Sequence, residues 1–257
     1  MPLHRDRTRA SSFGDAAELY DRARPTYPES LVDELVGQGA SDIDLLDVGC
    51  GTGISSRLFL ARGCRVLGVE ADIRMAEVAR ARGVAVEVAT FETWADAGRR
   101  FDLLTAAQAW HWVDPTLGSV KAAAVVRPGG RVGHFWNRGT HDPSTTAALE
   151  VVYREHAPEL VGSSILLGAG TEARFDASLA ALAATGAFDD LRMMAFPWTK
   201  DYTTEQWLEH ASTHSDHAGL PPERQQALYD GIRAVLDDRG GRTTVAYRTV
   251  LVTGTRR

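Results

Sequence analysis

Three glycines at alternate positions, Gly49, Gly51 and Gly53, are the residues whose spacing most directly indicates chemistry in this chain. They follow the apolar run 44–48, and an acid, Asp47, stands two residues before the first of them. A strand that ends in a glycine-rich loop and leads into a helix is how an α/β sheet forms a nucleotide-sized pocket. Glycine lets the backbone approach a ligand there, because no side chain stands in the way.

The glycine spacing does not fit a dinucleotide. That fingerprint needs its third glycine at the sixth position of the motif, where this chain has Ile54. An acid such as Asp47 ahead of the loop suits a ligand with a positively charged end and not a diphosphate. Glu70 follows about twenty residues later, where a carboxylate can accept hydrogen bonds from ribose hydroxyls. A ligand with a ribose, a cationic group and no phosphate is S-adenosylmethionine.

Residues 45–53 resemble the first motif of class I S-adenosylmethionine-dependent methyltransferases, and Glu70 matches the acid at the end of their second strand. The segment 90–92 is similar to their adenine-contacting segment, and Arg127-Pro128-Gly129-Gly130 to their turn before strand five. Residues 13–28 and 108–112 resemble a subgroup that acts on small molecules and includes trans-aconitate-type and natural-product methyltransferases. The likeness covers residues 13–137 well, 190–253 more loosely, and the stretch between them hardly at all.

The elements that must position these residues alternate between strand and helix, which predicts an α/β fold with a parallel sheet covered on both faces. Strands are expected at 44–48, 65–70, 84–89, 101–107, 131–136, 191–198 and 243–253. The resemblance implies a Rossmann-like seven-stranded sheet of order 3-2-1-4-5-7-6, with the last strand antiparallel. We expect one methyltransferase domain, 1–257, with an N-terminal lid segment at 13–28 and a helical insertion over the active site at 138–190.

The resemblance also implies a set of cofactor contacts: Tyr20, Arg24, Asp47, Gly49, Cys50, Gly51, Gly53, Glu70, Ala71, Thr90, Phe91, Glu92 and Gln108. Tyr20 and Arg24 lie four residues apart on one helix face. In a lid, Tyr20 would face the methyl group and Arg24 would take the carboxylate of the cofactor; a plain helix surface is the alternative. Asp47 either reaches the ammonium group of the ligand or braces the loop. Phe91 either lies near the adenine or belongs to the core.

His111 is the residue best placed for a catalytic role, together with Tyr20. It lies just beyond the fourth strand, and ligands in such sheets lie outside the carboxyl ends of the strands. Histidine is the usual base near neutral pH, but a carboxylate ligand and a structural histidine are the competing interpretations. The predicted substrate-binding residues are Trp110, His111, Trp112, Trp136 and Asn137. Three further histidines, His210, His214 and His217, form no ligand-like set and are interpreted as packing or surface residues.

Together these patterns predict an enzyme that transfers a methyl group from S-adenosylmethionine to a small molecule by in-line displacement. The acceptor is an oxygen, nitrogen or carbon nucleophile or a carboxylate. A non-catalytic protein that binds the cofactor is the alternative, and an NAD-dependent oxidoreductase is disfavoured by the glycine spacing. Aromatic side chains near the site suit planar rings or an amine, and a carboxylate held by Arg24 or His111 is equally compatible.

Composition excludes several other classes. A net charge of −6 over 257 residues argues against a main role in gripping nucleic acid, and the segment after strand four lacks the Asn-Pro-Pro-Tyr-like sequence of base-modifying methyltransferases. Cys50 and Cys64 give no disulfide framework and no structural zinc set, and no pattern requires a metal. With no signal-like start and no apolar run of about 18 residues, we expect no membrane association and a cytoplasmic protein.

Overall fold

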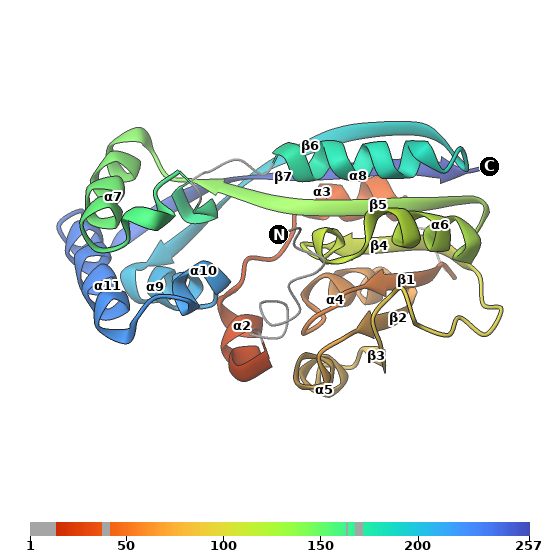
Figure 1. Ribbon diagram of the computed structural model, residues 1–257, viewed down its shortest axis with the longest axis horizontal. Helices are drawn as coiled ribbons and strands as arrows, with labels where there is room; N and C mark the ends of the chain where they lie inside the picture. The colour runs from red at the N-terminus through yellow and green to blue at the C-terminus, as the bar shows by residue number, and fades with distance from the viewer. Residues whose placement is uncertain (1–13, 38–41, 163, 168–171) are drawn as a thin grey trace.

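The computed structural model describes residues 14–37, 42–162, 164–167 and 172–257 (Figure 1). Phe13, the first residue of the predicted lid segment, lies outside these ranges. Within them, a seven-stranded sheet has the order β3-β2-β1-β4-β5-β7-β6. The strands are β1 (Asp44–Val48), β2 (Arg65–Glu70), β3 (Ala85–Val88), β4 (Phe101–Ala107), β5 (Val126–Thr140), β6 (Phe188–Thr203) and β7 (Arg242–Arg256).

The pairing of the strands confirms the predicted topology. β1 pairs in parallel with β2 and β4, and β3 and β5 extend the parallel part on either side. β7 runs antiparallel to both β5 and β6. Because parallel strands end at the same edge of a sheet, the loops after β1, β2 and β4 meet there.

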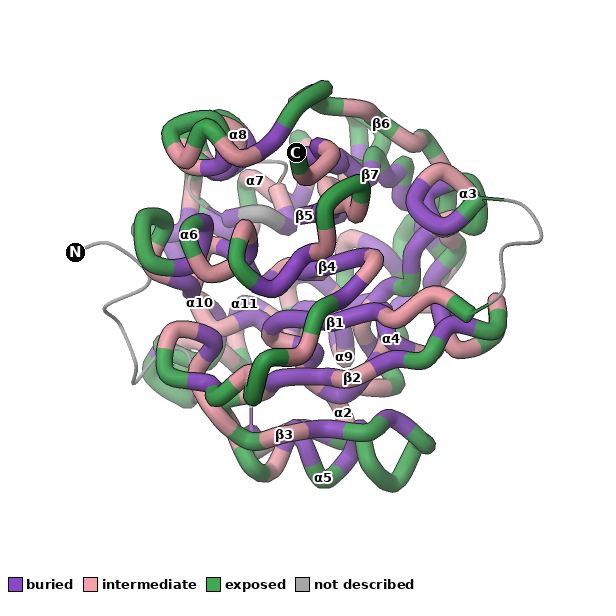
Figure 2. Tube along the Cα trace, turned by 90° about the vertical axis from the view of Figure 1, so that its right-hand side faces the viewer, coloured by how far each residue is buried: buried purple, intermediate pink, exposed green. Residues whose placement is uncertain are grey.

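Helices cover both faces of the sheet. Successive strand residues point to opposite faces: Leu45 packs in the layer formed with α3 (Glu29–Val36), α4 (Ile54–Leu60) and α5 (Ile73–Ala81), whereas Leu46 packs with α6 (Pro115–Val125) and α8 (Glu172–Ala184). Both leucines are fully buried. Figure 2 shows the buried residues running through β1 and β4 in the middle of the sheet.

Side-chain capping bonds fix the starts of two helices at the edge of the sheet. The Asp72 carboxylate accepts a hydrogen bond from the backbone N–H of Arg74, and α5 begins at the next residue. Asp114 accepts from the N–H groups of Thr116 and Leu117 at the start of α6. Each side chain satisfies amide groups that a helix leaves unpaired at its N-terminus.

Four helices, here called the helical cap, gather at one end of the molecule, where β5, β6 and β7 extend beyond the rest of the sheet (Figure 1). They are α7 (Pro143–His156), α9 (Thr204–Ser212), α10 (Ser215–Ala218) and α11 (Pro222–Asp237). Their shared core includes Leu149, Trp207 and Ile232. The lid helix α2 (Ala17–Ala23) contacts both α9 and α5, so it bridges the cap and the sheet. The short helices η2 (Gly14–Ala16), η3 (Trp110–Trp112), η4 (Pro158–Leu160) and η5 (Ile165–Leu167) complete the described elements.

The structure differs from the predicted insertion at 138–190 in two respects. β5 continues to Thr140 because its pairing with β7 extends that far, to Thr140 opposite Ala246. Only α7 belongs to the cap, whereas α8 packs on β6 and β7 beside α6, with Phe175 and Leu182 in the core of the sheet. The inserted segment therefore contributes to both parts of the fold. No helix within the described ranges is long and apolar enough to cross a membrane.

Candidate functional site

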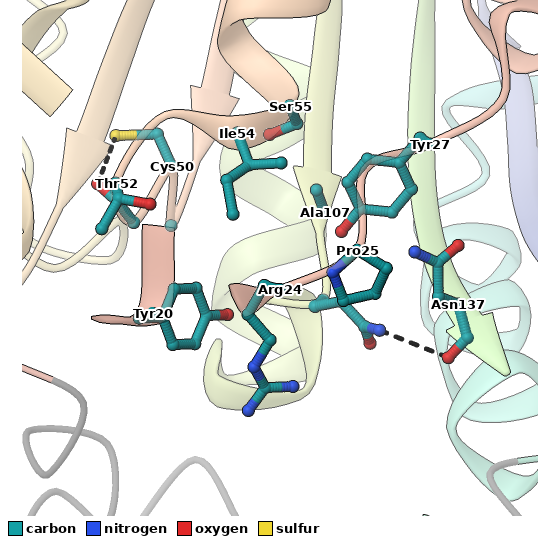
Figure 3. Close-up of a pocket in the computed structure, with 13 residues that line it drawn as sticks. Tyr20, Arg24, Pro25, Tyr27, Cys50, Thr52, Ile54, Ser55, Ala107 and Asn137 are labelled. Atoms are coloured by element: carbon teal, nitrogen blue, oxygen red, sulfur yellow. Dashed lines mark hydrogen bonds between the residues drawn. The ribbon is translucent and has the colours of Figure 1, made fainter. Parts of the chain in front are cut away.

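A pocket of about 440 Å³, open solvent included, lies at the carboxyl ends of β1 and β4 (Figure 3). This is where ligands bind in open α/β sheets. Its wall comes from the glycine-rich loop, the end of β4, the end of β5 and the segment after α2. The lining residues are Tyr20, Arg24, Pro25, Tyr27, Gly49, Cys50, Gly51, Thr52, Ile54, Ser55, Ala107, Gln108 and Asn137.

The loop after β1 needs its glycines for conformation and for space. Gly49, Gly51 and Gly53 all have positive φ, at 64°, 56° and 83°. A Cβ on Gly49 would lie 2.6 Å from the Cβ of Ala109, and one on Gly53 would lie 2.8 Å from Val84. Both distances are too short for a real contact, so the loop adopts this path only with glycine at these positions.

The carboxylate of Asp47 lies beneath this loop and is fully buried. It accepts hydrogen bonds from the hydroxyls of Ser55 (2.8 Å), Ser56 (2.6 Å) and Thr105 (2.9 Å). Burial raises the pKa of Asp47, and the three hydroxyl donors act in the opposite direction. These contacts join β1, β4 and the first turn of α4, and they favour the bracing alternative for Asp47.

Glu70, at the end of β2, holds the other side of the loop. Its carboxylate accepts from the backbone N–H of Gly51 and from that of Asp72, each at 2.9 Å. Burial raises the pKa of Glu70, while the backbone donors lower it. Each oxygen retains further acceptor capacity for a ligand hydroxyl.

The end of β4 holds a residue in a strained conformation. Gln108 has φ +54°, which is uncommon for a residue with a side chain and often marks a functional site. Its N–H donates to the carbonyl of Phe135, and its side-chain amide donates to the carbonyl of Asn137 at 3.3 Å. Asn137 in turn donates to the carbonyl of Thr26 and accepts from the hydroxyl of Thr249. This chain of bonds ties the lid segment to β5 and β4.

The lid side of the pocket carries a cation. The Arg24 guanidinium lies 4.7 Å from the centre of the Tyr20 ring and donates to the carbonyl of Thr213 at 2.7 Å (Figure 3 shows the two side chains together). Two buried polar atoms of the pocket residues, Arg24 Nε and Thr52 Oγ1, have no hydrogen-bond partner among the described residues. Buried polar atoms are normally paired, so both atoms indicate where a ligand binds.

His111 does not line the pocket, but a neighbouring side chain determines which of its ring nitrogens carries the proton. The indole N–H of Trp136 donates to His111 Nδ1 at 3.2 Å. Because indole nitrogen is a donor only, Nδ1 is the acceptor, and the neutral ring carries its proton on Nε2. That tautomer makes Nε2 a hydrogen-bond donor and leaves no nitrogen ready to take a proton while the indole bond persists.

Several aromatic residues predicted to contact ligands pack in the core. Phe91 is 3% exposed and packs against Trp94 and Trp110, which favours the core alternative, while its contact with the adenine stays a prediction. Trp110 stacks on the His134 ring at 3.8 Å, and Trp136 is 1% exposed against Phe175.

Other predicted residues also lie outside the pocket wall. Trp112 lies beside His111, with ring centres 5.1 Å apart. Thr90 bonds Thr93, Glu92 accepts from the N–H of Asp114, and Ala71 is exposed beyond Glu70.

The pocket also includes residues that the sequence did not single out: Pro25, Tyr27, Thr52, Ile54, Ser55 and Ala107. All except Ala107 belong to the lid segment or to the loop and first turn of α4, so their segments were identified but not their individual side chains. Tyr27 is buried with its ring edge-on to Phe135, 4.8 Å between centres. Burial raises the pKa of Tyr27 well above its usual value, so the phenol stays protonated.

Comparison with known proteins finds a matching family model and several relatives, all of them methyltransferases by name. A family model described as a methyltransferase domain matches residues 20–157, more than half of the chain. An uncharacterised methyltransferase of Mycobacterium tuberculosis (strain ATCC 25618 / H37Rv) is 38% identical over 134 residues, 49% of this chain and 52% of that protein. A ubiquinone biosynthesis O-methyltransferase of Methylobacterium sp. (strain 4-46) is 32% identical over 174 residues, 65% of this chain and 61% of that protein. The chain thus spans about half the length of the first relative.

Among solved structures, a candidate type II methyltransferase from Anaeromyxobacter dehalogenans has a TM-score of 0.67 at 23% identity, covering 90% of this chain and 97% of that one. This likeness shows the same fold.

Proposed function

Because this chain belongs to the class I S-adenosylmethionine-dependent methyltransferases, we propose that it transfers a methyl group from S-adenosylmethionine to a small-molecule acceptor. The observation that carries the proposal is the pocket at the carboxyl ends of β1 and β4, built from the glycine-rich loop and closed by Tyr20 and Arg24. The sheet, the lid segment and the helical cap act together as one methyltransferase domain. The net charge of −6 favours a small acceptor over nucleic acid.

The residues present fit the cofactor. The backbone of the glycine loop would accommodate its methionine part, and Glu70 its ribose hydroxyls. Arg24, whose Nε is buried without a partner among the described residues, would take its carboxylate. The unpaired hydroxyl of Thr52 offers a further polar contact in the same pocket. Asp47 would act indirectly by holding the loop in place through Ser55, Ser56 and Thr105.

S-adenosylmethionine, when bound, supplies a methyl group on a positively charged sulfur. The protein then has to align the acceptor and exclude water. Tyr20, Tyr27 and Pro25 cover the pocket from the lid side. The bonds from Asn137 to Thr26 and from Arg24 to Thr213 hold that cover against β5 and the cap.

We propose that His111, which lies outside the wall of the cofactor pocket, meets the acceptor beyond that wall, where it orients the acceptor as a hydrogen-bond donor through Nε2 and does not act as the base. The Trp136 bond to Nδ1 supports this assignment. Oxygen methylation is the activity named for the Methylobacterium relative. It would then need a methyl acceptor whose hydroxyl or carboxyl group ionises on its own, or one that carries its own basic group to take the proton.

Binding and transfer measurements test the donor assignment. Isothermal titration is expected to show binding of S-adenosylhomocysteine and none of NAD, because the loop lacks the third glycine of the dinucleotide motif. Labelled S-adenosylmethionine with a panel of acids, phenols and amines is then expected to label at least one acceptor. Binding of NAD in place of S-adenosylhomocysteine would overturn the proposal. Cofactor binding without transfer to any panel member would support the alternative, a non-catalytic binding protein.

Substitutions of His111 distinguish a donor from a base. His111→Ala is expected to lower kcat/KM by roughly 10- to 100-fold with unchanged affinity for S-adenosylhomocysteine. His111→Gln is expected to recover most of the activity, because its amide N–H can replace the Nε2 donor. Steady-state kinetics with the acceptor found in the panel provides the measurement, and His156→Gln on α7 is the matched control. Equal loss in the Ala and Gln variants would indicate a base.

A further inference from the structure

The helical cap contains a buried group of histidines that the mechanism above does not use. His210 on α9, the adjoining His214, and His217 on α10 are 3%, 8% and 0% exposed, respectively. They are therefore not surface residues. Tyr153, Tyr202 and Tyr229 pack around them, with ring centres within 6 Å of a histidine ring. We call these six residues the histidine cluster.

The hydrogen bonds within the histidine cluster leave buried nitrogen atoms unpaired. His217 Nε2 lies 2.9 Å from the Tyr153 hydroxyl, and His210 Nε2 lies 3.5 Å from His214 Nε2. The second nitrogens of two rings, His210 Nδ1 and His217 Nδ1, have no partner within the described part of the chain. An unpaired buried nitrogen destabilises the fold. If these rings served only for packing, an apolar ring such as phenylalanine would do so without that cost.

The histidine cluster adjoins the cofactor pocket through Arg24. The guanidinium that lines the pocket also donates to the carbonyl of Thr213, between His210 and His214 in sequence. Figure 1 shows α2, which ends just before this arginine, beside α9, and the two helices are in contact. Arg24 Nε, a donor, is a third buried nitrogen without a partner in the described ranges.

The charges around the histidine cluster favour an anion. Burial, and then the nearby Arg24, lower the pKa of His210 and of His214, and Lys200 adds to the effect on His210. The rings therefore stay neutral and offer N–H groups beside two fixed cations. One acid, Asp216, is close enough to oppose the lowering of the His217 pKa. No group of three or more histidine, cysteine or acidic residues within the described ranges could hold a metal ion.

We propose that the histidine cluster and Arg24 form the subsite for an anionic group, a carboxylate or a phosphate, on the acceptor. The inference rests on the proposed function, since it names the class of acceptor for the same pocket. An oxyanion needs N–H donors next to cations. Arg24 has enough N–H groups to serve Thr213, the cofactor and the acceptor, and His210 Nδ1 and His217 Nδ1 are donors in the tautomer that carries the ring proton on Nδ1. The aromatic rings of the cluster would pack against the body of the acceptor.

Titration of three small probes tests this subsite. S-adenosylhomocysteine binding is measured first, and benzoate, phenyl phosphate and benzamide are then titrated into that complex. We expect benzoate or phenyl phosphate to bind and the neutral, isosteric benzamide to bind at least tenfold more weakly. The preference between the two anions distinguishes a carboxylate from a phosphate acceptor. Binding of S-adenosylhomocysteine with no anion binding overturns this inference alone, whereas loss of both overturns the proposed function as well.

A single variant separates recognition from packing. His210→Phe keeps a ring against Tyr202 and Trp207 and removes the unpaired nitrogen. We expect anion affinity to fall at least tenfold, with unchanged S-adenosylhomocysteine affinity and a Tm no lower than that of the parent. His156→Phe on α7 is the control. Unchanged anion affinity in His210→Phe overturns the subsite, and His214→Gln answers the same question if that variant does not fold.

Discussion

Gly49→Ala is expected to weaken S-adenosylhomocysteine binding by at least about 100-fold, which corresponds to about 2.7 kcal/mol. Gly49 has φ +64°, and its new Cβ would lie 2.6 Å from the Cβ of Ala109. The loop can relieve this contact only by moving, and movement breaks the bond from the Gly51 N–H to Glu70. The variant therefore disturbs the loop and Glu70, the proposed ribose acceptor, together.

A second glycine supplies the matched control for this experiment. Gly63 also has a positive φ, +82°, but a Cβ there would meet nothing within 4 Å. Gly63→Ala thus carries a similar backbone penalty, of about 1–2 kcal/mol, without the clash and away from the pocket. Isothermal titration and urea unfolding of both variants give the comparison. Equal losses of cofactor affinity would mean that general destabilisation, and not the loop geometry, explains the effect.

On acidification from pH 7 to pH 5, His134 and His141 together are expected to lower the free energy of unfolding by about 4 kcal/mol, in addition to the loss from the buried histidines of the cap. Burial lowers the pKa of His134 to about 3 and that of His141 to about 4. Each histidine takes up its proton only on unfolding, so its stabilising contribution is complete above about pH 6.5. The contribution is lost as the pH falls toward the folded pKa, at about 2 kcal/mol each by pH 5. Asp47 and Glu70, whose pKa values burial raises, act in the opposite direction at lower pH.

Urea unfolding at several pH values measures this loss. His134→Phe keeps a ring stacked on Trp110 and removes one of the two titrating groups. The variant is expected to lose about 2 kcal/mol less than the parent between pH 7 and pH 5. His156→Phe, which removes a partly exposed histidine of α7, is the control. The explanation fails if His134→Phe and the parent show the same pH dependence.

Much of the fold could be predicted because local signals agreed with the tertiary structure. β1 and β4 are short apolar runs with clear ends, and both have the expected bounds, 44–48 and 101–107. β5 begins earlier than expected, at Val126 opposite Phe101, so the expected turn 127–130 lies within the strand. At their other ends β5, β6 and β7 are lengthened by antiparallel pairing that carries them into the cap, where Trp198 stacks on Tyr247. Such pairing depends on a partner far away in sequence, and the strands themselves become less regularly apolar there.

The candidate site could be predicted by segment more reliably than by side chain. Tyr20, Arg24, Gln108 and Asn137 line the pocket as expected, because α2, the loop after β4 and β5 all face it. Trp136 immediately precedes Asn137, yet its ring points into the core, since adjacent strand residues face opposite sides. The histidines of the cap were interpreted only as packing or surface residues, because Tyr153 and Tyr229, which pack against His217, come from distant parts of the sequence.

The place of β7 in the sheet affects how the chain folds while it is being translated. β7 lies between β5 and β6 in the sheet, although it follows both of them in the chain. β5 and β6 are therefore connected in the sheet only through β7. While the chain emerges from the ribosome, β5 presents an unpaired edge and β6 has no neighbour. Unpaired edges invite pairing with other chains, so the nascent chain is open to such mispairing until Arg242–Arg256 are in place.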